Sequence, residues 1–354
     1  MKRLIVLGVV AAALGFAGQA GAAASFKVFL GEQTRPPAGT PKGATLNAFL
    51  PSALTINAGD SVTFSSGGFH TVTYAPKPAP LFVPDPAKGT YTDILDAAGS
   101  PFYFDGLPKL IYNPVAFGPS GPKTISGKTP VSSGVLVPPG KKPVTATYTF
   151  PTPGVFHLFC AVHPGMKQTV VVKPAGGAVP KTPAQVQAQA LSDVGAGWAK
   201  TKAEAEAAKP AANTVYMGLG KTSALLEYFP KVLTVKAGTT VNFVNRSPSE
   251  VHNVVFGGKK YYQALSKKTD LLPLGPNSPN QVAPFLPFGS EPKGQYTYDG
   301  ANHGNGFLST PLATGTPGVP LPHASKVTFT KPGRYSYLCW IHGPDMSGTI
   351  VVTP

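Results

Sequence analysis

Cysteine is scarce in this chain of 354 residues, with Cys160 and Cys339 as its only copies. A disulfide-rich scaffold is thereby excluded. Charged residues make up only 13% of the chain, about half the usual share. With a hydrophobic content of 42%, this excludes a disordered polyelectrolyte. Arginine supplies four of the 30 basic residues and no basic run is interleaved with aromatics, so no nucleic-acid partner is expected.

Long hydrophobic runs are absent beyond the N-terminus. There, Met1-Lys2-Arg3 precedes an apolar stretch over 4–17 and small residues up to Ala24. This order predicts a secretory signal peptide over 1–24. The alternative is a membrane anchor, but the apolar stretch is shorter than the roughly 20 residues that span a bilayer. We therefore expect an exported protein, periplasmic or extracellular, with no stable membrane anchor.

The chain contains a long internal repeat. Cys160 and Cys339 are 179 residues apart, and the same interval separates His163 from His342. Matching sequence surrounds both cysteines, which favours two copies of one site over a disulfide between them, the other reading for an oxidising compartment. The length also fits two domains. We predict domains over 25–174 and 213–354.

Each half consists of short segments with alternating apolar and polar residues, separated by Gly, Pro and Asn. With 40 Gly and 40 Pro in the chain, long helices are not expected in most of it. The fold class is therefore predicted to be all-β, with one sandwich per half. Two long Pro- and Gly-rich inserts, 75–143 and 257–323, have no assigned structure, and inserts of this length are often functional.

An Ala-rich linker over 175–212 joins the halves. Thr182-Pro183 predicts a helix start, and Pro210 a stop. Trp198 lies on the apolar face, one of four residues spaced four apart. We predict a helix packed on one or both sandwiches, the alternative being a free spacer.

Both cysteines lie in motifs that resemble a metal-binding loop. The first is Cys160-Ala161-Val162-His163-Pro164-Gly165-Met166, and the second is Cys339-Trp340-Ile341-His342-Gly343-Pro344-Asp345-Met346. A thiolate, an imidazole and a thioether form a soft ligand set that suits copper. Each residue alone is more often a packing residue, but their joint occurrence in both halves favours a metal.

A blue copper site needs a second histidine to complete a His₂Cys plane with a long axial Met. His70 and His252 occupy similar places after the turns at Gly59 and Gly238. The predicted ligands are two sets of four, one per half: His70, Cys160, His163 and Met166; and His252, Cys339, His342 and Met346. The cofactor is predicted to be two type 1 copper ions, with zinc or an empty site as alternatives.

These motifs resemble the cupredoxin family, the blue copper proteins of the plastocyanin, azurin and amicyanin type. The resemblance covers both halves but not the linker or the inserts. It implies tandem Greek-key sandwiches with the metal at one end of each. It also implies that Asn253 and, as a weaker match, Thr71 tie the ligand loops together. The ring edges of His163 and His342 would lie at the surface as entry and exit points for electrons.

The function expected is single-electron transfer through two type 1 centres. The alternatives are a copper oxidoreductase, of the multicopper oxidase or nitrite reductase kind, and a storage or delivery protein. The enzymes are disfavoured because no His-x-His pair occurs and Phe159 and Leu338, not His, precede the cysteines. Storage is disfavoured because the chain has only four Met. A third metal site made of His157, His303 and His323 is not expected.

The chain has a net charge of +15, or about +13 without Lys2 and Arg3. A charge of this size steers association with oppositely charged molecules. We therefore expect an acidic redox partner protein.

Overall fold

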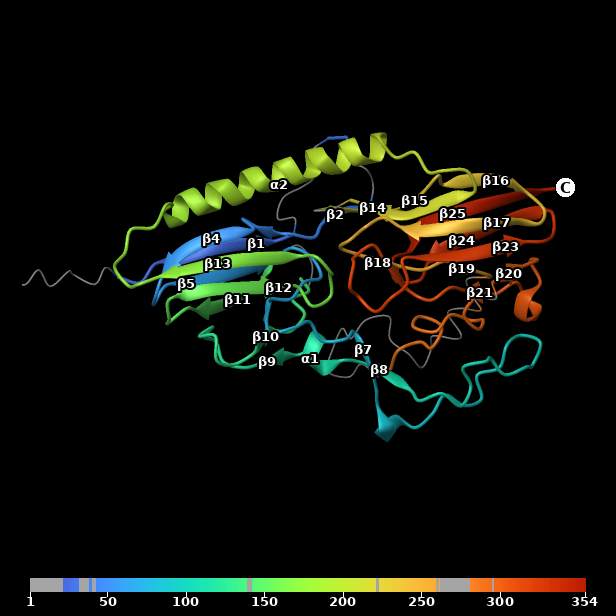
Figure 1. Ribbon diagram of the computed structural model, residues 1–354, viewed down its shortest axis with the longest axis horizontal. Coiled ribbons are helices and arrows are strands. Elements are labelled where there is room, and N and C mark those ends of the chain that lie inside the picture. The colour runs from blue at the N-terminus through green and yellow to red at the C-terminus, as the bar shows by residue number, and fades with distance from the viewer. Residues whose placement is uncertain are drawn as a thin grey trace, which may run out of the picture.

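The structure is a computed structural model that describes residues 22–31, 38–39, 43–138, 142–220, 223–258, 261, 281–294 and 296–354. The predicted signal peptide lies outside the described residues, except for 22–24. Among the helices described, none has the length and apolar character needed to cross a bilayer. Figure 1 shows two β-sandwiches side by side, with one long helix, α2, that lies along the first and reaches the near side of the second.

The first half forms two sheets around one core. One sheet has the order β11 (Val144–Thr149), β5 (Ser61–Ser66), β1 (Ser25–Leu30) and β3 (Phe49–Leu50). The other has the order β4 (Ala53–Asn57), β13 (Lys167–Lys173), β12 (Gly154–Phe159), β6 (Thr73–Tyr74), β10 (Val131–Ser133) and β9 (Pro119–Ser120). Alternate residues of both sheets, such as Phe64 and Val170, are fully buried in a shared cluster, as expected of a sandwich.

The second half repeats this plan. One sheet has the order β2 (Ala44–Leu46), β15 (Ser223–Phe229), β14 (Thr214–Leu219), β17 (Thr239–Asn245), β23 (Ala324–Phe329) and β20 (Thr297–Tyr298). The other has the order β16 (Val232–Lys236), β25 (Gly343–Thr353), β24 (Gly333–Cys339), β19 (Val255–Phe256) and β21 (Leu308–Ser309). The parallel β1–β5 pair places Val28 opposite Phe64, and β14–β17 places Val215 opposite Phe243. The all-β prediction is confirmed.

Strand β2 crosses from one half to the other. It lies within 25–174, yet it pairs with β15, with Leu46 opposite Ser223. The chain between β2 and β3 therefore bridges the sandwiches. Two further pairs flank this region, β7 (Phe82–Pro84) with β8 (Leu110–Tyr112) and β18 (Val251–His252) with β22 (Ala313–Thr314).

The linker helix α2 (Pro183–Glu206) is docked on both halves. It starts with a capping box, in which Thr182 Oγ1 accepts from the Gln185 N–H and Gln185 Oε1 accepts from the Thr182 N–H. Trp198 is 1% exposed and packs with Phe29 of β1 and Leu46 of β2. The free-spacer alternative is therefore wrong for this helix. The remaining helices are short: α1 (Pro114–Phe117), η1 (Pro86–Lys88) and η2 (Asn302–Gly304).

The insert of the first half packs on the second half. Its residues Phe102 and Tyr112 share a buried cluster with Phe285 and Trp340, and Tyr91 donates from its hydroxyl to the Val282 carbonyl at 2.9 Å. The two sandwiches are thus held together by this cluster, by β2 and by α2.

Candidate metal centres

The loop after β12 brings three of the predicted ligands of the first half together. Cys160 directly follows the strand, and its N–H donates to the Met166 carbonyl at 3.0 Å. The Met166 N–H donates to the His163 carbonyl at 3.2 Å. This tight loop holds Cys160 and His163 opposite His70, whose backbone bridges to Leu136.

The ligand atoms of both halves have nearly the same geometry. In the first centre, His163 Nδ1 is 3.1 Å from His70 Nδ1 and 3.4 Å from Cys160 Sγ. In the second, His342 Nδ1 is 3.2 Å from the Nδ1 atom of His252 and 3.4 Å from Cys339 Sγ. The two imidazole rings make an angle of 57° in each centre.

These distances fit one ion per centre. In zinc sites, imidazole nitrogens bind at about 2.0–2.1 Å and thiolates at about 2.3 Å, so donors 3–4 Å apart can contact a common ion. Both cysteines are free and buried, and each is grouped with two histidines. Two nitrogens and one thiolate form the donor set of a blue copper plane. The residues present therefore fit copper.

Each thiol is surrounded by groups that favour the thiolate. Burial raises the pKa of Cys160, but His163 and His70 outweigh it and hold this pKa well below its ordinary value. Burial likewise raises the pKa of Cys339, and His342 and His252 bring it well below. The thiolate is the form of cysteine that binds metals. The surroundings of both cysteines therefore favour the metal-binding form.

The predicted axial ligands are buried next to the centres. Met166 is 2% exposed in the cluster that contains Cys160, and Met346 is fully buried in the cluster that contains Cys339. Axial ligation by either thioether stays a prediction.

A glycine packs against the free edge of each strand histidine, a feature missed in the sequence. A Cβ atom on Gly31 would lie 2.6 Å from His70 Nε2, and one on Gly218 would lie 2.5 Å from His252 Nε2. Both glycines have φ near +67° (Gly31 +67°, Gly218 +68°), a conformation that L-residues rarely adopt. In both halves this glycine lies at or near the end of a strand that pairs in parallel, β1 or β14. That shared position is the sequence feature that could have identified it.

Thr71 and Asn253 tie the ligand segments together, as the resemblance implied. Thr71 Oγ1 accepts from the Ala161 N–H at 2.7 Å, and Asn253 Oδ1 accepts from the Trp340 N–H at 2.9 Å. The residue after the first histidine thus fixes the residue after the cysteine in both halves, and Thr71 fills the role as fully as Asn253.

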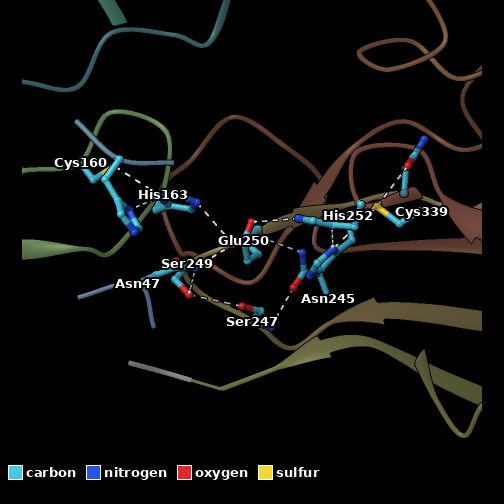
Figure 2. A network of polar contacts seen from close by, with 12 residues as sticks. Asn47, Cys160, His163, Asn245, Ser247, Ser249, Glu250, His252 and Cys339 are labelled. Carbon is cyan, nitrogen blue, oxygen red and sulfur yellow. Dashed lines mark hydrogen bonds and ion pairs between the residues drawn. The ribbon is translucent and has the colours of Figure 1, made fainter. Parts of the chain in front are cut away.

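The ring edges of His163 and His342 do not lie at the surface, so this expectation is wrong. The exposed fraction of their side chains is only 9% and 14%. Both edges point to Glu250, as Figure 2 shows for the first centre, where His163 Nε2 is 3.4 Å from Glu250 Oε1. His342 Nε2 is 3.5 Å from the other oxygen, Oε2. The two halves meet at the ends that carry the ligands, which encloses both edges.

Beside Glu250, an apolar cavity of about 240 Å³ reaches both His163 and His342, with Phe82 and Tyr112 in its wall.

The three histidines outside the two centres have unrelated partners. His157 contacts the Thr169 hydroxyl at 3.2 Å, and His323 contacts the Thr314 carbonyl at 2.6 Å. His303 lies between Asp96 and Glu291. Among the described residues, none of these three histidines belongs to a group of possible metal ligands.

No protein-family model matches the chain. Over 135 residues, it is 30% identical to the chloroplast plastocyanin of Chlamydomonas reinhardtii. That match covers 38% of this chain and 63% of the plastocyanin, so the chain spans less than two thirds of this relative.

Among solved structures, a mutant amicyanin in the Cu(I) form is 23% identical, with 42% of this chain and 90% of that chain covered and a TM-score of 0.22. A purple cupredoxin from Nitrosopumilus maritimus is 16% identical, with 40% and 98% covered and a TM-score of 0.21.

Proposed function

We propose that the chain is a cupredoxin, an exported blue copper protein that carries single electrons through two type 1 centres. Its 30% identity to a plastocyanin over 135 residues supports this proposal. The observation that carries this proposal is the pair of buried His–Cys–His groups with matching geometry. His70, Cys160 and His163 would hold one ion, and His252, Cys339 and His342 the other. Copper bound there would supply a one-electron couple.

The surroundings support electron transfer over catalysis. Catalysis at copper needs an open ligand position and further metal-binding residues. No His-x-His pair occurs in the sequence, and Phe159 and Leu338 precede the two cysteines. Both centres are instead set among buried apolar residues that belong to the two sandwich cores, a shell that holds the ligands in place and restricts water.

Absorption spectroscopy with copper quantification tests the proposal. The exported form loaded with Cu(II) is expected to bind two coppers per chain and to show an intense thiolate-to-copper band. Cys160→Ser and Cys339→Ser are each expected to remove about half of the copper and of the colour, because each destroys one thiolate site. A colourless protein, or one with Cys160 and Cys339 joined in a disulfide, would refute it.

We further propose an acidic protein as the redox partner, steered by the net charge of about +13 that remains without Lys2 and Arg3. The rate of electron exchange with an acidic acceptor protein should fall as ionic strength rises, because salt screens the attraction. A rate that does not depend on salt would contradict this partner class.

A further inference from the structure

Glu250 is a buried carboxylate at the junction of the two halves. Its side chain is 9% exposed, and one of its oxygens faces His163 Nε2 at 3.4 Å, as Figure 2 shows. The other oxygen faces His342 Nε2 of the second centre at 3.5 Å. It is also two residues before His252, a predicted ligand of the second centre. One side chain therefore touches a ligand of each centre.

The position of Glu250 is fixed from both sides of the junction. Asn47, next to the crossing strand β2, donates from Nδ2 to Glu250 Oε1 at 2.7 Å. Asn245, at the end of β17, donates from Nδ2 to the Glu250 carbonyl at 3.1 Å. A buried carboxylate is strongly unfavourable unless it is paired and hydrogen-bonded. Here its partners are one amide and the two imidazoles.

We propose that Glu250 is a positioning residue shared by the two centres, which sets the properties of both at once. The inference rests on the proposal that these sites hold copper. A ligating histidine commonly passes its other N–H to a carboxylate, which fixes the ring and raises its basicity as a ligand. In this chain, a single carboxylate does so for two sites in different sandwiches.

The shared carboxylate has two physical consequences. Its negative charge stabilises the more positive, oxidised state of a bound ion on either side. It also fixes the imidazoles of His163 and His342 at once, because each ring contacts the same carboxylate. Loss of Glu250 should therefore weaken Cu(II) binding and raise the reduction potential in both centres together.

Glu250→Gln tests this inference, because glutamine keeps the shape and removes the charge. The affinity for Cu(II) is measured by competition titration with Cys339→Ser present to isolate the first centre and with Cys160→Ser present to isolate the second. We expect a loss of about tenfold or more at each centre, the size usual for such partners. Both reduction potentials should also rise in spectroelectrochemistry.

Two matched variants control for other causes. Glu206→Gln removes a negative charge from an exposed site on α2 and should change neither centre. Thr71→Ala alters a residue that contacts only the first centre and should leave the second unchanged. A Glu250→Gln effect confined to one centre, or no effect at either in a folded protein, would overturn the inference.

A metal-free measurement separates this inference from the proposed function. In hydrogen exchange of the metal-free chain, Glu250→Gln should increase exchange in both ligand loops, 160–166 and 339–346. Co(II) binding to the two thiolates gives a second readout that needs no electron transfer. If Glu250→Gln does not fold, Asn47→Ala should weaken Co(II) binding at both centres, because Asn47 holds Glu250. Unchanged binding at either centre in Asn47→Ala would count against the shared role.

Discussion

In the first centre, the N–H of Thr71 donates to Cys160 Sγ at 3.3 Å. In the second, Cys339 Sγ is instead 3.7 Å from the side-chain oxygen of Asn253. The nitrogen and sulfur atoms are otherwise arranged alike in the two centres. The repeat thus keeps the donor set while it varies the groups around the sulfur. Since hydrogen bonding to the sulfur tunes the potential of blue copper sites, copper bound at the two proposed centres would have two different reduction potentials.

The residue after each cysteine differs as well. Ala161 is small, whereas Trp340 packs edge-on against Phe285 with ring centroids 4.6 Å apart. Trp340 and Phe285 belong to the cluster that joins the insert of the first half to the second half. The second centre is therefore linked to the first insert through Trp340, whereas the first centre meets the second half through His163 and Glu250.

The largest expected effect comes from disabling one centre at a time. Gly31→Ala should displace His70, and Gly218→Ala should displace His252, because the new Cβ atom would lie 2.6 or 2.5 Å from Nε2. At Gly31 the Cβ atom would also lie 2.6 Å from the Leu46 carbonyl oxygen. Each variant should lose copper from its own centre only, as followed by absorption and copper content.

Gly59→Ala and Gly238→Ala are the matched controls. These glycines also have positive φ, but a Cβ atom there meets nothing within 4 Å. They carry only the backbone cost, about 1–3 kcal/mol, and should keep both coppers. Equal copper loss in the controls would mean that backbone strain, and not the contact with histidine, is responsible.

A smaller effect is expected from the residues that tie the ligand loops. Asn253→Ala leaves the buried Trp340 N–H without its acceptor and also removes contacts with Ser309 and Thr310. Thr71→Ala removes the acceptor of the Ala161 N–H. A buried unsatisfied group costs about 1–3 kcal/mol, so Asn253→Ala should destabilise the protein more. Denaturant unfolding measures both, with Thr63→Ala as control, because this half-buried threonine makes only a solvent-exposed hydroxyl contact with Thr147. A larger loss of stability in Thr71→Ala than in Asn253→Ala would show that the hydrogen bond of Thr71 matters more than the contacts of Asn253.

A difference in potential should sharpen the comparison further. The N–H donated to Cys160 Sγ withdraws charge from the thiolate and favours the reduced ion. We therefore expect the first centre to have the higher reduction potential, by an amount of the order of the roughly 59 mV that a tenfold preference represents. Spectroelectrochemistry of Cys339→Ser and Cys160→Ser gives the two values separately. A higher value for the second centre would contradict this role of the hydrogen bond.

The smallest effect concerns an ionic contact between His303 of the second half and the insert of the first half. His303 lies between Glu291 and Asp96 of the first insert, with Asp96 Oδ2 3.1 Å from Nδ1. Burial lowers the pKa of His303, but the two carboxylates raise it above its ordinary value of 6.5. Burial raises the pKa of Asp96, but hydrogen bonds from Ser100 and His303 bring it below 3.8.

The contribution of this cluster to stability is therefore lost as pH rises through the raised pKa of His303. It is also lost as pH falls through the lowered pKa of Asp96. It should be fully present between about pH 4 and 6.5. His303→Gln should lower the melting temperature by a few degrees at most in that window, and by less at pH 9. The exposed His157→Gln is the control, and a loss that does not vary with pH would refute the ionic origin.

Much of each half could be predicted from local sequence. The alternating pattern along β5 and β17 specifies strands with one buried face, because side chains alternate across a strand. Cys160 and His163, like Cys339 and His342, are close in sequence, so a short loop alone brings them together. Thr182 and Pro183 likewise specify the start of α2 without any tertiary contact.

The tertiary structure alone decided how the halves face each other. Glu250 looks like an ordinary acidic residue in the sequence, and its role exists only because His163 and His342 approach it from different sandwiches. Likewise, Leu46 of β2 pairs with Ser223 of β15 across the junction, although the two residues are far apart in sequence. Ligand type and spacing are local properties of the chain. Burial of the ring edges and the sharing of one carboxylate depend on packing between residues far apart in sequence, which no local pattern encodes.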